Sequence, residues 1–218
     1  MQTGKIGKVI SVNVGLPQVV KWKGRLVSTG IFKEPVKGRV KLDKVNLDGD
    51  RQADLSVHGG PDKAIYVYAS EYYDFWRKEY PEITFNWGMF GENLTVSGLL
   101  DDEVNIGDRF RVGTTELVVT QPRLPCYKLG LRFGRDDIIK RFLKQEYSGF
   151  YLAVLQEGEI GEGDEIILVA REEHEVKVSD IVSLYIHGRD NLAKMKRATE
   201  VAALPDDWKE YFLEQLEE

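Results

Sequence analysis

A chain of 218 residues in which 42% are hydrophobic and 30% are charged can bury a full-sized core, and this composition excludes an intrinsically disordered protein. No apolar run approaches the ~18 residues of a membrane-spanning helix, and the first residues lack the apolar stretch of a signal peptide. The single cysteine excludes an intramolecular disulfide and fits a reducing compartment, so we expect a cytoplasmic protein.

The formal net charge of −6 is unevenly distributed, because residues 1–44 carry +8 and the remaining residues sum to −14. A positive segment in an acidic protein favours a site for a small anion such as a phosphate, since the local field steers the ligand. The alternative for most of these basic residues is a solvated strand face. A nucleic-acid polymer is not expected as a partner, because no recognised nucleic-acid motif accompanies the segment.

Short runs rich in valine, isoleucine and aromatic residues, separated by glycine-bearing turns, predict a mainly β fold. A hairpin is predicted at 112–116 and a turn at 159–163. Two helices interrupt the strands, one from Ser70 to Tyr80, which Pro81 ends, and one over 136–145. The predicted strands are 6–14, 25–31, 39–45, 64–68, 93–96, 109–112, 116–120 and 165–169.

The character of the chain changes after Ala170, where residues 171–175 form a charged linker. Three short helical patterns follow, over 179–186, over 190–203 and from Pro205 onward. Short helices are marginal alone, so they must pack on one another, on the β domain or on a partner. We therefore predict a β domain over 1–170 and a small helical domain over 171–218.

Cys126 is the residue that points most directly to chemistry. Pro122 and Pro125 keep its segment out of regular structure, while Arg123 and Lys128 bring positive charge that favours a thiolate. A thiolate can bind a metal or attack carbon. The alternative is that a lone cysteine serves as a small buried apolar side chain.

Two other segments are candidates for a site. His58 lies before Gly59, Gly60 and Pro61, where glycines allow the backbone to approach a ligand and the imidazole can donate a hydrogen bond or a proton. Residues 91–94 place Glu92 and Asn93 in a turn that enters a strand. No Cys-x-x-Cys pair, Walker loop, dinucleotide-binding glycine motif or nucleophile elbow is present, so redox chemistry requires an imported cofactor.

Five motifs follow one another along the chain, at residues 25–36, 49–54, 58–64, 91–94 and 121–128. In this order they resemble the MOSC domain family, and the chain as a whole resembles its YiiM-like bacterial members, which add a C-terminal three-helix domain. The resemblance implies a β-barrel-like domain with interspersed helices and a small α-helical domain. It also implies a bound molybdenum cofactor, molybdenum ligation by Cys126, and detoxifying reduction of N-hydroxylated compounds such as hydroxylaminopurines.

The resemblance also assigns roles to the residues in these motifs. Arg25, Thr29 and Lys33 are expected to hold the phosphate of the pterin cofactor, with Arg123 close to the metal. His58 and Asn93 are expected to contact the pterin or the substrate, with His58 also in a catalytic role, and Gln121 is a further donor to the cofactor.

The reaction implied by the resemblance needs a small N-hydroxylated substrate and electrons from a separate reductase protein. The helices from Val178 onward are expected to dock this electron donor or to restrict access to the site, or else simply to cover the β domain. Two other functions remain open. Cys126 and His58 could act as nucleophile and base in an acyl-transfer or hydrolytic enzyme, or the protein could carry the cofactor without catalysis.

Overall fold

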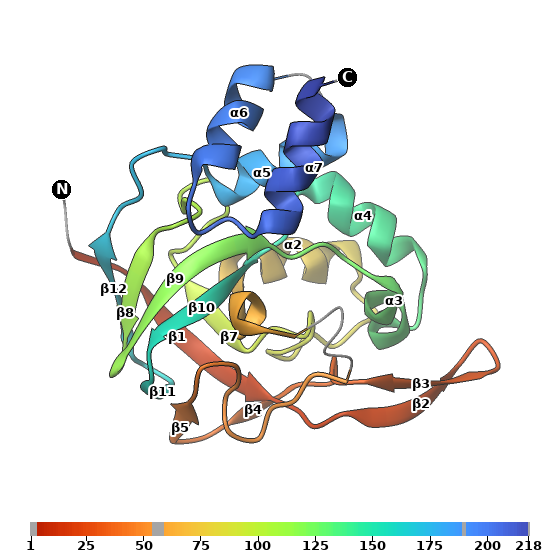
Figure 1. Ribbon diagram of the computed structural model, residues 1–218. Helices are drawn as coiled ribbons and strands as arrows, with labels where there is room; N and C mark the ends of the chain where they lie inside the picture. The colour runs from red at the N-terminus through yellow and green to blue at the C-terminus, as the bar shows by residue number, and fades with distance from the viewer. Residues whose placement is uncertain (1–3, 54–58, 189–190, 218) are drawn as a thin grey trace.

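The computed structural model describes residues 4–53, 59–188 and 191–217, and a closed barrel of seven strands lies at its centre (Figure 1). The strands follow one another around the barrel in the order β12, β8, β9, β10, β6, β7 and β1, and pairing between β12 and β1 closes the ring. Closure leaves no unpaired edge in the ring. The bounds are β1 Gly4–Val14, β6 Ile65–Ala69, β7 Leu94–Ser97, β8 Arg109–Val112, β9 Thr115–Pro122, β10 Phe150–Gln156 and β12 Glu165–Ala170.

The strand pairs of the barrel are antiparallel except that β6 and β7 run parallel. A parallel pair needs a crossover connection, and helix α2 (Ser70–Glu79) provides it. The predicted hairpin between β8 and β9 is confirmed, with Val112 opposite Thr115 and Gly113 at a positive φ of 57°. Alternate residues of β8 are buried and exposed, which matches a strand with one face on the core.

Three smaller β elements extend the barrel at one end. Strand β4 (Glu34–Val36) pairs with β1, and β5 (Arg39–Leu42) pairs with β11 (Gly158–Gly161). Strands β2 (Gln18–Trp22) and β3 (Arg25–Thr29) form a hairpin that runs outward along the bottom of Figure 1. The turn end of this hairpin therefore lies away from the barrel, whereas its base leads back to the barrel at Thr29.

An aromatic cluster packs beside the barrel and supports the segment that follows β9. It contains Tyr68, Trp76, Phe90 and Phe142, which come from β6, α2, the loop before β7 and α4 (Asp137–Gln145). Tyr68 and Phe90 stack with their ring centroids 4.4 Å apart, and the Trp76 indole donates a hydrogen bond to the Tyr68 hydroxyl at 2.8 Å. Helix α3 (Tyr127–Phe133) completes this part of the fold. A short 3₁₀ turn, η1 (Pro61–Lys63), precedes β6.

The three C-terminal helices share the core of the barrel. Helices α5 (Val178–His187), α6 (Leu192–Glu200) and α7 (Asp206–Glu217) lie over the top of the barrel in Figure 1. Ile181, Met195, Trp208 and Phe212 belong to the same cluster of buried residues as the barrel interior. The helices therefore cover a face of the β domain, and their removal would expose part of its core. Within the described residues no helix is long and apolar enough to cross a membrane.

Several elements differ from those that the sequence pattern predicts. Strands β2, β4 and β10 and helix α3 were not expected, and the turn expected at 159–163 begins with strand β11, which extends to Gly161. The residues of β10 are all apolar up to Leu155, so its sequence shows no alternation of polar and apolar side chains that would mark a strand. α3 is one short stretch of seven residues, too short for a periodic pattern.

Asp101 connects three parts of the fold through its buried carboxylate and its backbone. Its Oδ2 accepts hydrogen bonds from the backbone N–H and hydroxyl of Ser148 and from the Gly149 N–H, at 2.8–2.9 Å. Its own N–H donates to the Tyr72 hydroxyl and its carbonyl accepts from the Ser179 N–H at the start of α5. Oδ1 is buried and has no hydrogen-bond partner among the residues that the structure describes, and burial raises the pKa of the carboxyl to about 6.

This raised pKa predicts a pH-dependent stability. Between the ordinary value of 3.8 and about 6 the folded state binds more protons than the unfolded state, so the free energy of unfolding falls as pH rises. The contribution of Asp101 to that fall is on the order of 2–3 kcal/mol. We expect Asp101→Asn to remove this part of the slope in urea unfolding between pH 4 and pH 7 (roughly the titration range). Parallel profiles of the two proteins would contradict the prediction.

Candidate functional site

An inner cavity of about 100 Å³ lies where the loops after β3 and β9 meet the barrel. Loops from five parts of the chain form its wall, and the ends of β6 and β10 contribute Tyr66 and Tyr151. The lining residues are Thr29, Gly30, Ile31, Lys33, Arg51, Gln52, Ala53, Lys63, Tyr66, Phe90, Gly91, Asn93, Arg123, Leu124, Cys126, Lys128 and Tyr151.

Five cationic side chains line this cavity, and none of the described lining residues carries a carboxylate. A concave site whose wall carries only positive charge attracts an anion. The five are Lys33, Arg51, Lys63, Arg123 and Lys128. The inner cavity therefore has the electrostatic character of a phosphate site.

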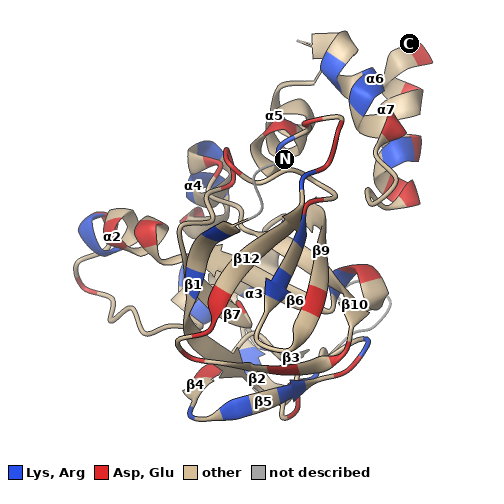
Figure 2. Ribbon diagram, turned by 90° about the vertical axis from the view of Figure 1, so that its left-hand side faces the viewer, with Lys and Arg blue, Asp and Glu red and all other residues tan. Residues whose placement is uncertain are grey.

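The remaining basic residues of the N-terminal segment do not gather at the cavity. In Figure 2 blue segments are spread along β1 and β5, where Lys5 pairs with Glu165 at 2.8 Å and Arg39 pairs with Asp164 at 3.0 Å. These two ion pairs are at least partly exposed and contribute little to stability. These residues therefore lie on solvated strand faces, which is the alternative that the sequence left open.

Arg123 has a buried guanidinium group that lacks a full set of acceptors. The residue is 6% exposed, and its guanidinium lies over the rings of Tyr66 and Phe142, 5.5 and 5.2 Å from their centroids. Among the described residues its Nη1 has no hydrogen-bond partner. A buried donor without an acceptor costs about 1–3 kcal/mol, so this atom is suited to an anion that enters the cavity.

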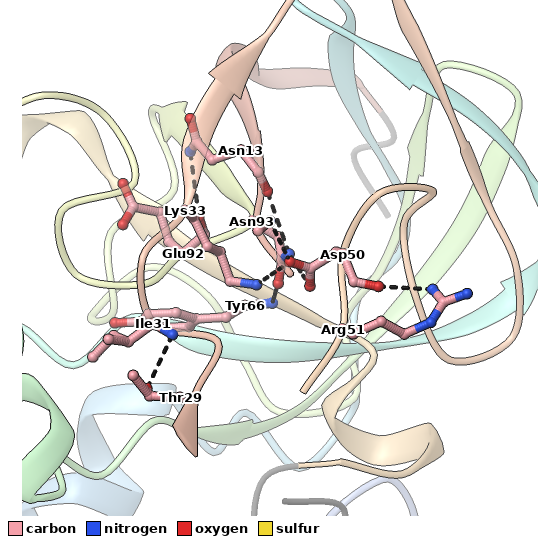
Figure 3. A network of polar contacts seen from close by, with 10 residues as sticks. Asn13, Thr29, Ile31, Lys33, Asp50, Arg51, Tyr66, Glu92 and Asn93 are labelled. Atoms are coloured by element: carbon pink, nitrogen blue, oxygen red, sulfur yellow. Dashed lines mark hydrogen bonds and ion pairs between the residues drawn. The ribbon is translucent and has the colours of Figure 1, made fainter. Parts of the chain in front are cut away.

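A second network fixes the loops that form the cavity (Figure 3). The Lys33 ammonium pairs with Asp50 Oδ1 at 2.5 Å, and the Asn93 amide donates to Asp50 Oδ2 at 2.9 Å. The Asn93 Oδ1 accepts from the Tyr66 N–H at 3.1 Å. Burial lowers the pKa of Lys33, and Asp50 opposes this shift. Because Asp50 matches its charge, Lys33 acts chiefly as a structural cation, and Asn93 likewise acts through loop geometry.

The loop before β7 depends on the residues that flank Asn93. Glu92 is fully buried and accepts hydrogen bonds from the Tyr73 hydroxyl and from the N–H groups of Gly88 and Phe90. Gly91 has φ of +81°, and a Cβ there would lie 2.9 Å from Ile31 Cγ1. The Gly-Glu-Asn sequence is therefore needed to fold the cavity wall.

Cys126 lies at the border between the inner cavity and a second, outer hollow of about 630 Å³. It is the half-buried residue before α3, with extended backbone, and its carbonyl accepts from the Leu129 N–H at 2.9 Å. Lys63, Leu124 and Tyr151 also line both spaces. The thiol thus lies where a group bound in the inner cavity would meet a molecule in the outer hollow.

The outer hollow has one wall from the barrel loops and one from the C-terminal helices. Gln121 lies on the barrel side, and its Oε1 accepts a hydrogen bond from the Trp208 indole at 3.1 Å. Tyr185, Pro205, Asp207 and Tyr211 accompany Trp208 on the helical side.

The structure brings together most of the residues that the sequence singled out. Thr29, Lys33, Asn93, Arg123 and Cys126 line the inner cavity, and Gln121 lines the outer hollow.

Two of the expected residues are not among them. His58 lies outside the described residues. Arg25 is exposed, stands opposite Trp22 at the turn end of the hairpin, and lines neither space, so its expected contact with the phosphate stays a prediction. Its position follows from the length of β3, which carries the start of the motif away from the cavity and brings Thr29 to it.

Sequence reasoning passed over Arg51, Tyr66 and Tyr151. Arg51 lies within the 49–54 motif, and its Nη1 donates to the carbonyl of Asp50 at 2.7 Å. The motif could therefore have indicated Arg51 as a site residue. Nothing in the sequence indicated the two tyrosines, because aromatic residues in strands are ordinarily core residues.

Two family models match the chain. The MOSC domain matches residues 54–167, and the YiiM-like, 3-alpha helix domain matches residues 178–218. The resemblance inferred from the motifs is thereby confirmed, together with the C-terminal helical segment.

Individual relatives match over most of the chain. It is 40% identical to the Bacillus subtilis protein YflK, over 95% of this chain and 93% of that protein. The crystal structure of YiiM from Geobacillus stearothermophilus has a TM-score of 0.81 at 38% identity, covering 96% of this chain and 99% of that one. A Gibberella moniliformis protein named Reductase is 34% identical over 78% of this chain, which corresponds to 30% of that protein.

We expect inorganic phosphate to bind in the inner cavity and raise the melting temperature of the protein, because a ligand of the folded state stabilises it. Arg123→Met keeps an unbranched side chain of similar length but removes the charge, and it should weaken phosphate binding by about tenfold or more. Arg25→Ala is the matched control and should bind as the wild type does. Equal phosphate affinity in wild type and Arg123→Met, measured by calorimetry, would contradict the assignment.

Proposed function

Because the chain belongs to the MOSC domain family and ends in the YiiM-like three-helix domain, we propose that it is a molybdenum-cofactor-dependent reductase of N-hydroxylated compounds. MOSC domains are associated with binding of the molybdenum cofactor. The observation that carries the proposal is the position of Cys126, at the edge of a cavity lined with cations and beside a second hollow with room for a substrate.

The residues of the inner cavity fit a group that bears a phosphate and a soft metal. Arg51 and Arg123 offer planar donors to phosphate oxygens, with Lys63 and Lys128 as point charges. The Cys126 thiolate is a soft ligand of the kind that suits molybdenum. No group of three or more His, Cys, Asp or Glu residues in the described chain could hold a metal by itself, so the metal would come with its own cofactor.

The cofactor supplies, when bound, a two-electron redox centre suited to oxygen-atom transfer. The proposed reaction breaks the N–O bond of the substrate, consumes two electrons and two protons, and releases an amine and water. Tyr151 lines both spaces, and burial raises the pKa of its hydroxyl, which therefore stays protonated. We assign Tyr151 as a hydrogen-bond donor to the departing hydroxyl.

The electrons would come from a separate protein of the flavin or iron–sulfur class, because the chain has no motif for such a cofactor. The Gibberella moniliformis protein named Reductase supports a partnership of this kind, since the matched module makes up 30% of its length. We place the protein in the cytoplasm, where a reducing environment would keep the Cys126 thiol available.

We expect Cys126→Ser to lower the reduction of an N-hydroxylated purine by at least about a hundredfold, because a serine hydroxyl is neither soft nor ionised at neutral pH. The variant should retain its far-UV circular dichroism, since the half-buried thiol is replaced by a group of similar size. Activity is measured on protein from a cofactor-competent host, together with the molybdenum content.

Two outcomes would overturn the proposal. Full activity in Cys126→Ser would remove the thiolate from the mechanism. Wild-type protein that retains molybdenum but reduces no N-hydroxylated compound with any reductant would instead establish a non-catalytic cofactor carrier.

A further inference from the structure

The turn before β10 holds both the backbone and the side chain of Arg123. The Gly149 carbonyl accepts a hydrogen bond from the Arg123 N–H at 3.2 Å. The Ser148 carbonyl accepts from the Tyr66 hydroxyl at 2.8 Å, and the Arg123 guanidinium lies over the Tyr66 ring. Ser148 and Gly149 are not among the described residues that line the inner cavity. They therefore act on a bound anion only through the residues that they contact.

Asp101 fixes the orientation of the peptide group between Ser148 and Gly149. The Gly149 N–H of this peptide donates to Asp101 Oδ2 at 2.9 Å, and its Ser148 carbonyl accepts from Tyr66. Because a trans peptide is planar, its N–H and its carbonyl point in opposite directions. The carboxylate on one side and the Tyr66 hydroxyl on the other thus hold a single peptide group. Hydrogen bonds arranged in series in this way strengthen one another.

Gly149 does not set this orientation by itself. Its φ is +61°, and glycine adopts positive and negative φ about equally readily, so the peptide before it can turn over at little cost. A Cβ at this position would lie 2.3 Å from the Val67 carbonyl oxygen, which excludes a side chain. The turn therefore has to keep a glycine and needs a partner that selects one orientation of the peptide. Asp101 is that partner.

Stability alone does not explain a carboxylate at this position. Asp101 is 3% exposed, and burial raises the pKa of its carboxyl to about 6. The ionised form at neutral pH therefore lowers the stability of the fold. An asparagine would keep an acceptor oxygen for the turn without a buried charge. A buried group with a shifted pKa is typical of a functional position.

We propose that Asp101 is a positioning residue of the inner cavity, which fixes the Ser148–Gly149 peptide and, through it, the place of the Arg123 guanidinium on the cavity wall. The inference rests on the inner cavity as an anion site and does not require the reductase reaction. The Asp101 carbonyl also accepts from the Ser179 N–H in α5 at 2.9 Å. The same residue therefore joins the start of the C-terminal helices to the anion site.

Phosphate binding to the full chain, measured by calorimetry, tests the proposal without a substrate. Asp101→Asn keeps the shape of the side chain but removes its charge. The variant should bind phosphate about fivefold more weakly, because the hydrogen bonds that hold the turn are no longer charge-assisted.

Asp108→Asn is the matched control. Asp108 is also a fully buried carboxylate that accepts two backbone N–H bonds, from Asn105 at 2.9 Å and from Glu172 at 3.0 Å. It lines neither the inner cavity nor the outer hollow. This variant should bind phosphate within about twofold of wild type, because substitutions at independent sites have separate effects.

A double substitution separates positioning from a general structural effect. If Asp101 acts through Arg123, then Asp101→Asn should change the phosphate affinity by less than about twofold in an Arg123→Met background, because the group that it positions is gone. Ser148→Ala removes only the hydroxyl bond to Asp101 and should weaken phosphate binding by about twofold to threefold. This smaller change tests the proposal even if Asp101→Asn does not fold.

The outcomes separate this proposal from the reductase proposal. Equal phosphate affinity in Asp101→Asn and wild type would overturn the positioning role, as would an equal loss in Asp108→Asn or a loss that persists in full beside Arg123→Met. If Asp101→Asn does not fold, unchanged affinity in Ser148→Ala overturns it. If wild type binds no phosphate, the positioning role fails together with the anion site. If wild type reduces no N-hydroxylated compound but Asp101→Asn weakens phosphate binding, the reductase proposal fails and the positioning role stands.

Discussion

The inner cavity depends on one buried carboxylate. Asp50 is fully buried, and it accepts from the Lys33 ammonium, the Asn93 amide and the Gly15 N–H. Lys33 and Asn93 line the cavity themselves, and the Gly15 carbonyl accepts a hydrogen bond at 3.2 Å from the N–H of Arg51, which also lines it. Breaking a buried ion pair by removing one partner costs about 3–5 kcal/mol, because the other charge is left unmatched. The geometry of the site is thus held by the same interaction that neutralises Lys33.

Arg123 presents the opposite case on the same wall. Its guanidinium is buried against Tyr66 and Phe142, yet one of its nitrogens has no acceptor among the described residues. Buried donors are nearly always hydrogen-bonded, and exceptions tend to occur where a ligand completes the set. The contrast between Lys33, which has a carboxylate partner, and Arg123 divides the wall into a structural part and a part that is ready for an anion.

The C-terminal helices belong to the site as much as to the fold. Their apolar residues join the core of the barrel, and the Trp208–Gln121 hydrogen bond connects residues 87 positions apart. The family models treat residues 54–167 and 178–218 as separate segments, but the outer hollow exists only between them. The end of the chain and the strand before Cys126 therefore act together, which fits a module that relatives share over its full length.

The sequence by itself determined the β character of the first part, the three C-terminal helices and the importance of the segment around Cys126, because local patterns and ordered motifs carry these features. It also identified Thr29, Lys33, Asn93 and Arg123 as residues of one region. Only the tertiary structure decided that Arg25 points away with its hairpin and that Asp50 matches Lys33. It alone placed β10 between β9 and β6, and Trp208 on Gln121. Contacts between distant segments depend on how the barrel closes. Closure is set by the order and register of all the strands, so no short stretch of the sequence predicts it.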